Sequence, residues 1–242
     1  RRLEFEDNLK LLKEIGYEGF QVDFNDLDIN MLKKGFILDK ETYNAFNRIK
    51  KASENLKFPV LAMHTFYPLI SDEKKILEIF EKYLDYLSKL KSKYLIVHMS
   101  GYNKNKERLK SAMNVLDKAN NLYRRRKKEI LLENEHEPSL FINFKQIDYV
   151  LSKTKLNLCL DTSHALQSNL DLDRLYKNLK KRIKVFHLSD YNTKAHQEIG
   201  NGVLKKTRCF KSIIKSDKLI VVEINHALTE CKDTTELLNA YM

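Results

Sequence analysis

Histidines and carboxylates recur in this sequence at the ends of short apolar runs. His64 ends Pro-Val-Leu-Ala-Met-His, His98 ends Tyr-Leu-Ile-Val-His, and Glu133 ends Ile-Leu-Leu-Glu. All seven histidines lie at the end of such a run or a few residues beyond it. If the runs are parallel strands, their carboxyl ends meet on one face and bring these side chains together. Imidazoles and carboxylates that converge in this way are typical ligands of a divalent metal ion.

The elements that would position these residues alternate along the chain. Strand-like runs cover residues 20–24, 60–66, 94–99, 130–134, 156–161, 184–188 and 219–224, and an amphipathic stretch follows each of them. A helical pattern over residues 3–15 precedes the first run and stops at Gly16. Seven such units and one unpaired helix predict a (β/α)8 TIM barrel whose first strand is missing from this sequence. An open doubly wound sheet is the alternative, but its single ligand crevice would not explain polar residues at nearly every strand end.

The composition of the chain excludes several classes of protein. With 242 residues, 43% of them hydrophobic, the chain is long enough for one α/β domain over residues 1–242. Only 6 glycines and 3 prolines are present, so we expect no flexible linker to a second domain. No apolar run has the length of a membrane span, and the first residues do not resemble a signal peptide. Three widely spaced cysteines without a Cys-x-x-Cys motif fit a reducing compartment, so we expect a cytoplasmic location.

The chain has a formal net charge of +11, and the positions of its basic residues indicate what that charge does. The clusters Arg124–Lys128 and Lys180–Arg182 each precede a strand-like run, where a helix is expected to end. Cations at helix C-termini complement the helix dipole. We therefore expect these clusters to be solvated helix ends on the face opposite the histidines, and we favour a small-molecule partner over nucleic acid.

Seven short motifs follow one another in the order and spacing of a known family. They are Met63-His64-Thr65, Val97-His98, Leu132-Glu133-Asn134, Leu160-Asp161-Thr162-Ser163-His164-Ala165, His187-Leu188-Ser189-Asp190, His196-Gln197-Glu198-Ile199-Gly200-Asn201-Gly202 and Val222-Glu223. Through these motifs, nearly the whole chain resembles the xylose isomerase-like TIM-barrel superfamily. This superfamily includes sugar and sugar-phosphate isomerases and epimerases, and also the endonuclease IV class of apurinic-site nucleases (AP endonuclease family 2). Each motif is weak alone, and the signal comes from their order.

The isomerase and epimerase branch implies both a metal site and a reaction. Its members hold one divalent ion with a Glu, an Asp, a His and a second Glu from successive strand ends. The matching residues, called the metal quartet below, are Glu133, Asp161, His187 and Glu223. The resemblance also implies that Glu133 and Glu223 transfer protons to and from a sugar or sugar phosphate through an enediolate. The expected cofactor is Mn, Zn, Mg or Co, with no organic cofactor.

The nuclease branch is the alternative that the resemblance leaves open. Its members are zinc-dependent phosphodiesterases that act at apurinic/apyrimidinic sites in DNA repair. There the residues that match His64 and His98 bind a second metal ion, and those that match His164 and an Asp-x-His pair bind a third.

Two departures from the nuclease pattern favour the isomerase. The Asp-x-His pair reads Lys194-Ala195-His196 in this chain, so one carboxylate is lost, and the segment from His187 to His196 is shorter than in the nucleases. We therefore expect the remaining candidates to contact the substrate or to bind a second metal ion; they are His64, His98, His164 and His196. A further alternative is a degenerate barrel that binds a ligand without catalysis.

Overall fold

The computed structural model of the chain describes residues 5–23, 40–68, 72–99, 106–136 and 143–224. Seven strands form one sheet: β1 (Phe20–Asp23), β2 (Val60–Phe66), β3 (Tyr94–His98), β4 (Glu129–Glu133), β5 (Asn157–Asp161), β6 (Ile183–Leu188) and β7 (Leu219–Val222). Their order in the sheet is their order in the chain, and every neighbouring pair is parallel. The predicted strands are confirmed, with bounds that differ by no more than two residues.

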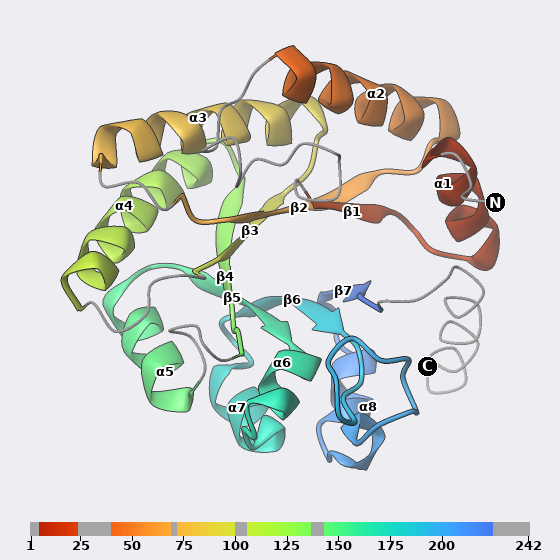
Figure 1. The fold of residues 1–242 in the computed structure, drawn as a ribbon, viewed down its shortest axis with the longest axis vertical. Helices are drawn as coiled ribbons and strands as arrows, with labels where there is room; N and C mark the ends of the chain where they lie inside the picture. Colours follow the sequence, from red (N-terminus) through yellow and green to blue (C-terminus); the bar gives the residue numbers. More distant parts are fainter. Residues whose placement is uncertain (1–4, 24–39, 69–71, 100–105, 137–142, 225–242) are drawn as a thin grey trace.

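Helices surround the sheet on its outer face, as Figure 1 shows. They are α1 (Phe5–Ile15), α2 (Lys40–Leu56), α3 (Glu73–Lys89), α4 (Lys106–Arg125), α5 (Phe144–Lys153), α6 (Thr162–Gln167), α7 (Leu172–Leu179), the 3-10 helix η1 (Leu204–Lys206) and α8 (Phe210–Ile214). Parallel strands in sequential order with helices outside form a TIM barrel, whereas an open doubly wound sheet reverses its strand order at a switch point. The open-sheet alternative is therefore wrong. Within the described ranges, no helix combines the length and apolar character that a membrane crossing requires.

The barrel is nearly closed, with a seam between β1 and β7. These two strands are the edges of the sheet, and no described strand lies between them. A cavity of about 300 Å³ is lined by Phe20 and Gln21 of β1 and by Val221 and Val222 of β7. The seam is where an eighth strand would pair, which is consistent with the expected missing first strand.

The inner face of the sheet explains why the polar residues converge. Strand residues two apart point to the same face, so each strand contributes successive side chains to the barrel interior. The lower layer is apolar, with one residue from each of β2 to β6: Ala62, Ile96, Leu131, Cys159 and Val185. Two residues further along the same strands come His64, His98, Glu133, Asp161 and His187, all buried. A larger apolar core lies on the other face, between the sheet and the helices.

Three helices are followed by a lysine with a left-handed backbone. The angle φ is 47° at Lys57 after α2, 58° at Lys91 after α3 and 56° at Lys127 after α4. Glycine is the usual residue at such a position, because a side chain there costs about 1–2 kcal/mol. These lysines precede β2, β3 and β4, at the end of the barrel opposite the polar layer. The cluster Arg124–Lys128 lies there too, at the end of α4, as the sequence predicted.

Candidate metal centre

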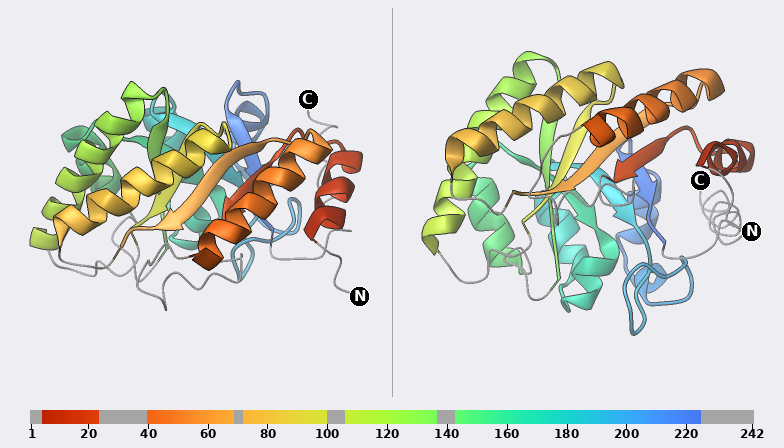
Figure 2. Two further views of the ribbon diagram at one scale, coloured as in Figure 1. Left: turned by 90° about the horizontal axis from the view of Figure 1, so that it is seen from above. Right: turned by 45° about the horizontal axis from the view of Figure 1, so that its top comes forward.

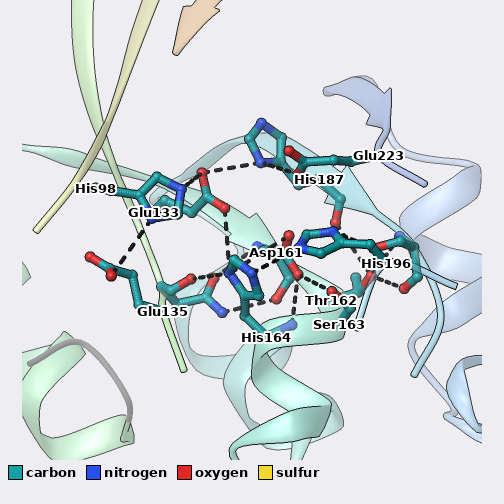
Figure 3. A network of polar contacts seen from close by, with 12 residues as sticks. His98, Glu133, Glu135, Asp161, Thr162, Ser163, His164, His187, His196 and Glu223 are labelled. Atoms are coloured by element: carbon teal, nitrogen blue, oxygen red, sulfur yellow. Dashed lines mark hydrogen bonds and ion pairs between the residues drawn. The ribbon is translucent and has the colours of Figure 1, made fainter. Parts of the chain in front are cut away.

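The metal quartet converges at the carboxyl end of the barrel (Figure 3). Nδ1 of His187 lies 2.9 Å from Oε2 of Glu223 and 3.1 Å from Oε2 of Glu133. One ligand atom from each of the four residues lies within 4.8 Å of those of the other three. Glu133, Asp161 and His187 are buried, whereas the side chain of Glu223 is 31% exposed. A single cation could therefore contact all four residues and still be reached from the barrel mouth.

Each residue of the quartet has one buried polar atom without a hydrogen bond in the described structure. These atoms are Oε1 of Glu133, Oδ2 of Asp161, Nδ1 of His187 and Oε2 of Glu223. Although His187 Nδ1 approaches two carboxylate oxygens, neither contact has hydrogen-bond geometry. Buried polar atoms of this kind are costly to leave without partners. Carboxylate oxygens and imidazole nitrogens are ligands that Zn²⁺ and related ions accept, so the donor set fits a divalent metal ion.

A second group of ligand atoms meets Glu133 from the side of β2 and β3. Nε2 of His64 lies 3.1 Å and Nε2 of His98 lies 3.2 Å from Oε2 of Glu133. The opposite nitrogen of each ring faces another carboxylate: Nδ1 of His64 donates to Oδ2 of Asp23 at 2.7 Å, and Nδ1 of His98 lies 3.7 Å from Oε2 of Glu135. Such outer partners fix the orientation of a metal-ligating imidazole.

A third group lies on the side of α6 and depends on the cap of that helix. Asp161 is the N-cap of α6, and its Oδ1 accepts hydrogen bonds from the backbone N–H of His164 at 2.7 Å and from Ser163 Oγ at 2.9 Å. This cap leaves Oδ2 free for the centre and holds His164 beside it. Nδ1 of His164 donates to the carbonyl oxygen of Asn134, and its Nε2 lies 3.1 Å from Nε2 of His196. The three members Asp161, His164 and His196 again have ligand atoms within 4.8 Å of one another.

The structure brings together all eight site candidates that the sequence analysis selected. It also adds outer residues that the sequence analysis did not select, namely Gln21, Asp23, Asn134 and Glu135. Gln21 accepts a hydrogen bond from Nε2 of His187 at 3.0 Å, which directs the other ring nitrogen toward the quartet. In the sequence, the only indication of Gln21 and Asp23 is their two-residue spacing on β1, which places both side chains on one face of the strand.

Lys194 and His136 are not members of these three groups. The side chain of Lys194 is exposed, whereas His196 two residues later is half-buried against His164. The ring of His136 lies 4.9 Å from the ring of His164, centroid to centroid, although the sequence analysis did not select it. His226 lies outside the described residues.

The buried charges of the centre shift the pKa values of one another. Burial opposes the charged form of His64, but its hydrogen bonds to Asp23 and Glu133 outweigh burial and raise its pKa to about 9. Burial likewise opposes charge on His98 and His187, yet the surrounding acidic groups raise both pKa values well above the usual range. Burial would raise the pKa of Glu133, but His187 and His98 hold it well below its usual range. Protons on the histidines therefore balance the carboxylate charge when no cation does.

One buried carboxylate holds the segment that carries His196. Oδ1 of Asp190 accepts hydrogen bonds from the backbone N–H groups of Tyr191 and Leu204, both at 2.8 Å, and Oδ2 accepts one from Gly200 at 2.9 Å. Asp190 is fully buried. The carboxylate thus closes the turn after β6 and brings His196 back to the third group.

An Asp190→Ala variant should therefore lose about 4 kcal/mol of unfolding free energy, because three backbone donors lose a charged acceptor. Urea unfolding would measure this loss. Asp72→Ala is the matched control, since Asp72 also accepts from two backbone N–H groups but at the exposed N-cap of α3. The control should lose only about 1 kcal/mol. Equal losses in the two variants would contradict the structural role of Asp190.

The family of the chain follows from its sequence match. Residues 9–241 match the family model described as a xylose isomerase-like TIM barrel. Because the match covers nearly the whole chain, the protein belongs to the xylose isomerase-like TIM-barrel family. The predicted family and the predicted barrel are confirmed. No curated protein sequence matches the chain at a significant level.

Three solved structures illustrate the range of proteins with this fold. The probable 3-DHS dehydratase of Bacillus anthracis has a TM-score of 0.77 at 15% identity, covering 99% of this chain and 94% of that one. A sugar phosphate isomerase/epimerase of Parabacteroides distasonis has a TM-score of 0.74 at 16% identity, covering 98% and 88%. Endonuclease IV of Thermus thermophilus has a TM-score of 0.66 at 20% identity, covering 98% and 93%. At such identities the similarity establishes the fold alone.

Proposed function

We propose that this chain is a divalent-metal-dependent isomerase or epimerase that acts on a sugar or sugar phosphate. The observation that carries the proposal is the set of four buried atoms without a hydrogen bond in the described structure, one from each residue of the metal quartet. The quartet has the Glu, Asp, His, Glu order of the isomerase branch that the chain resembles. The sugar phosphate isomerase/epimerase among the similar structures supports this class of reaction.

The quartet would hold the metal ion, and its two glutamates would move protons. A divalent ion there would stabilise the negative charge that develops on a substrate oxygen when the adjacent carbon loses its proton. Glu223 is the partly exposed member of the quartet, so its carboxylate can face a substrate at the barrel mouth. Burial would raise the pKa of Glu223, but His187 lowers it to about 2, which keeps the carboxylate ionised as a base. Glu133 lies across His187 and would deliver a different proton to the carbon, received from the ring of His64 or His98 that faces it. Glu223 would release the first proton to solvent at the mouth.

A Glu223→Gln variant should lose at least about 100-fold in the exchange of a carbon-bound substrate proton with solvent deuterium, because the base is gone. Proton NMR would follow the exchange on a panel of ketoses and ketose phosphates with added Mn²⁺. Glu198→Gln is the control, because Glu198 bonds Asn201 on the exposed part of the segment before η1. Unchanged exchange in Glu223→Gln, or no exchange by the unmodified protein with any member of the panel, would contradict the proposal.

A zinc-dependent phosphodiesterase of apurinic/apyrimidinic sites is the second candidate. The quartet shares Glu133 with the group of His64 and His98, and it shares Asp161 with the group of His164 and His196. Three ions bound in these groups would be neighbours, and neighbouring ions can stabilise the attacking and leaving oxygens of a phosphodiester, which favours this candidate. The exposed Lys194, where the nucleases have an aspartate, weighs against it.

Metal content and an incision assay separate the two candidates. One equivalent of bound metal and no incision of a duplex with a single apurinic site would support the isomerase. Three equivalents with efficient incision would overturn it. A Lys194→Asp variant tests the same point, because it restores a carboxylate to the third group and should raise incision only in a nuclease.

A further inference from the structure

A second pocket lies at the opposite end of the barrel from the metal centre. It is formed where α2 and α3 end and β2 and β3 begin, and these two helices cover the same side of the barrel (Figure 2). The cavity has a volume of about 420 Å³, which lies within the range of small-molecule sites. Its polar lining includes five lysines and a buried serine: Lys50, Lys57, Lys89, Lys91, Lys93 and Ser92.

The positive charge of this lysine pocket is largely uncompensated. Lys50 forms an ion pair with Glu54 at 2.8 Å, and Glu54 also lines the cavity. Lys93 lies over the ring of Tyr94 at 4.9 Å, a contact that leaves its charge in place. Among the described residues, no carboxylate forms an ion pair with Lys57 or Lys91. The C-terminal dipoles of α2 and α3 offset about half a charge each, which is less than the lysines supply.

Ser92 gives the pocket a polar group that has no partner. Only 1% of Ser92 is exposed, and its Oγ has no hydrogen bond in the described structure. Among the described residues, five buried side-chain atoms have no hydrogen bond; four belong to the metal quartet and the fifth is this hydroxyl. Buried hydroxyl groups are normally satisfied, so a ligand that enters the cavity and accepts a hydrogen bond would complete the site.

We propose that the lysine pocket binds a small anion with two or more phosphate groups, of the size of pyrophosphate. Five lysines lining one cavity suit a multiply charged anion, and the hydroxyl of Ser92 would donate to one of its oxygens. A duplex is too wide to enter a cavity of about 420 Å³ and would contact only the lysines at its rim. This site is independent of the proposed isomerase activity, because its residues lie at the other end of the strands.

The chain offers a variant that removes charge without harming the backbone. Lys57 and Lys91 both have positive φ, so Lys57→Gly with Lys91→Gly places glycine where a glycine is preferred. Lys127→Gly is a matched control, since Lys127 has the same backbone conformation, also follows a helix, and does not line the cavity. Ser92→Ala removes a hydroxyl that has no hydrogen bond to lose.

Calorimetric titration of the metal-free full chain with pyrophosphate tests the proposal. We expect saturable binding of one equivalent, weakened at least tenfold in the double variant and at least threefold in Ser92→Ala, and changed less than twofold in Lys127→Gly. No binding by the unmodified chain at millimolar pyrophosphate would overturn the proposal. Equal weakening in Lys127→Gly would also overturn it, because the binding would then reflect overall charge. Displacement of pyrophosphate by an equimolar short DNA duplex would replace the small-anion site with a nucleic-acid surface.

Discussion

A Glu133→Gln variant is expected to lose at least about 100-fold in affinity for a divalent metal ion. Loss of an outer partner of a metal site already costs about 10–100-fold, and Glu133 is itself placed as a ligand. Its carboxylate lies within 3.2 Å of ring nitrogens of His64, His98 and His187, and no other residue in the described part of the chain faces as many members of the centre. Competition titration with a chromophoric chelator would measure the affinity.

The same strand provides the control for this variant. Glu129 begins β4 and Glu133 ends it, and Glu129 contacts Arg124 and Asn157 at the far end of the barrel. Glu129→Gln makes the same chemical change in the same strand and should leave metal affinity within about twofold. If Glu133→Gln kept the affinity of the unmodified protein while its circular dichroism was native, the centre would not be a metal site.

The affinity for metal should rise by at least about 100-fold between pH 6 and pH 8. His64 has a pKa of about 9, and those of His98 and His187 are also raised, so these rings carry protons at neutral pH when no metal is bound. A metal ion binds the neutral ring and must displace those protons, which gives about a tenfold gain per pH unit for each proton released. Titrations at several pH values, together with proton release into a weakly buffered solution, would measure both effects. An affinity that does not change over this range would contradict the arrangement.

The stability of the metal-free protein should depend on pH in the opposite sense. A pKa raised from 6.5 to about 9 means that protonated His64 contributes stability below pH 6.5, and this contribution is lost as the pH rises through 9. Asp23→Asn removes the carboxylate that accepts from His64 and should flatten this part of the profile. Urea unfolding at pH 6.5 and above pH 9 would compare the two proteins.

Much of the fold could be predicted because the apolar runs and the polar residues that end them repeat along the chain. His64 comes two residues after Ala62, and Glu133 comes two residues after Leu131. This spacing is visible in the sequence and predicts that each pair points to the inner face of the sheet. The sequence does not show that the carboxylate of Asp190 accepts hydrogen bonds from three backbone N–H groups, because these contacts depend on how the segment after β6 folds back. For the same reason, the roles of Gln21 and Asp23 become clear only when β1 lies near β6 and β2.

The basic residues show a further limit of sequence reasoning. Lysines before the strands were expected to be solvated helix ends, and the position of Arg124–Lys128 agrees with that view. The sequence places Lys57 and Lys91 more than thirty residues apart, so their shared cavity depends on the pairing of β2 with β3. The missing hydrogen bond of Ser92 is likewise a property of the packed structure.

Anomalous diffraction from crystals soaked in Mn²⁺ or Zn²⁺ would show whether the metal quartet holds an ion. We expect an anomalous peak within about 2.0–2.5 Å of one atom from each of Glu133, Asp161, His187 and Glu223. The peak should disappear or weaken strongly in Glu223→Gln crystals. The absence of any peak at the quartet, at a metal concentration that gives a peak elsewhere in the same crystal, would contradict this expectation.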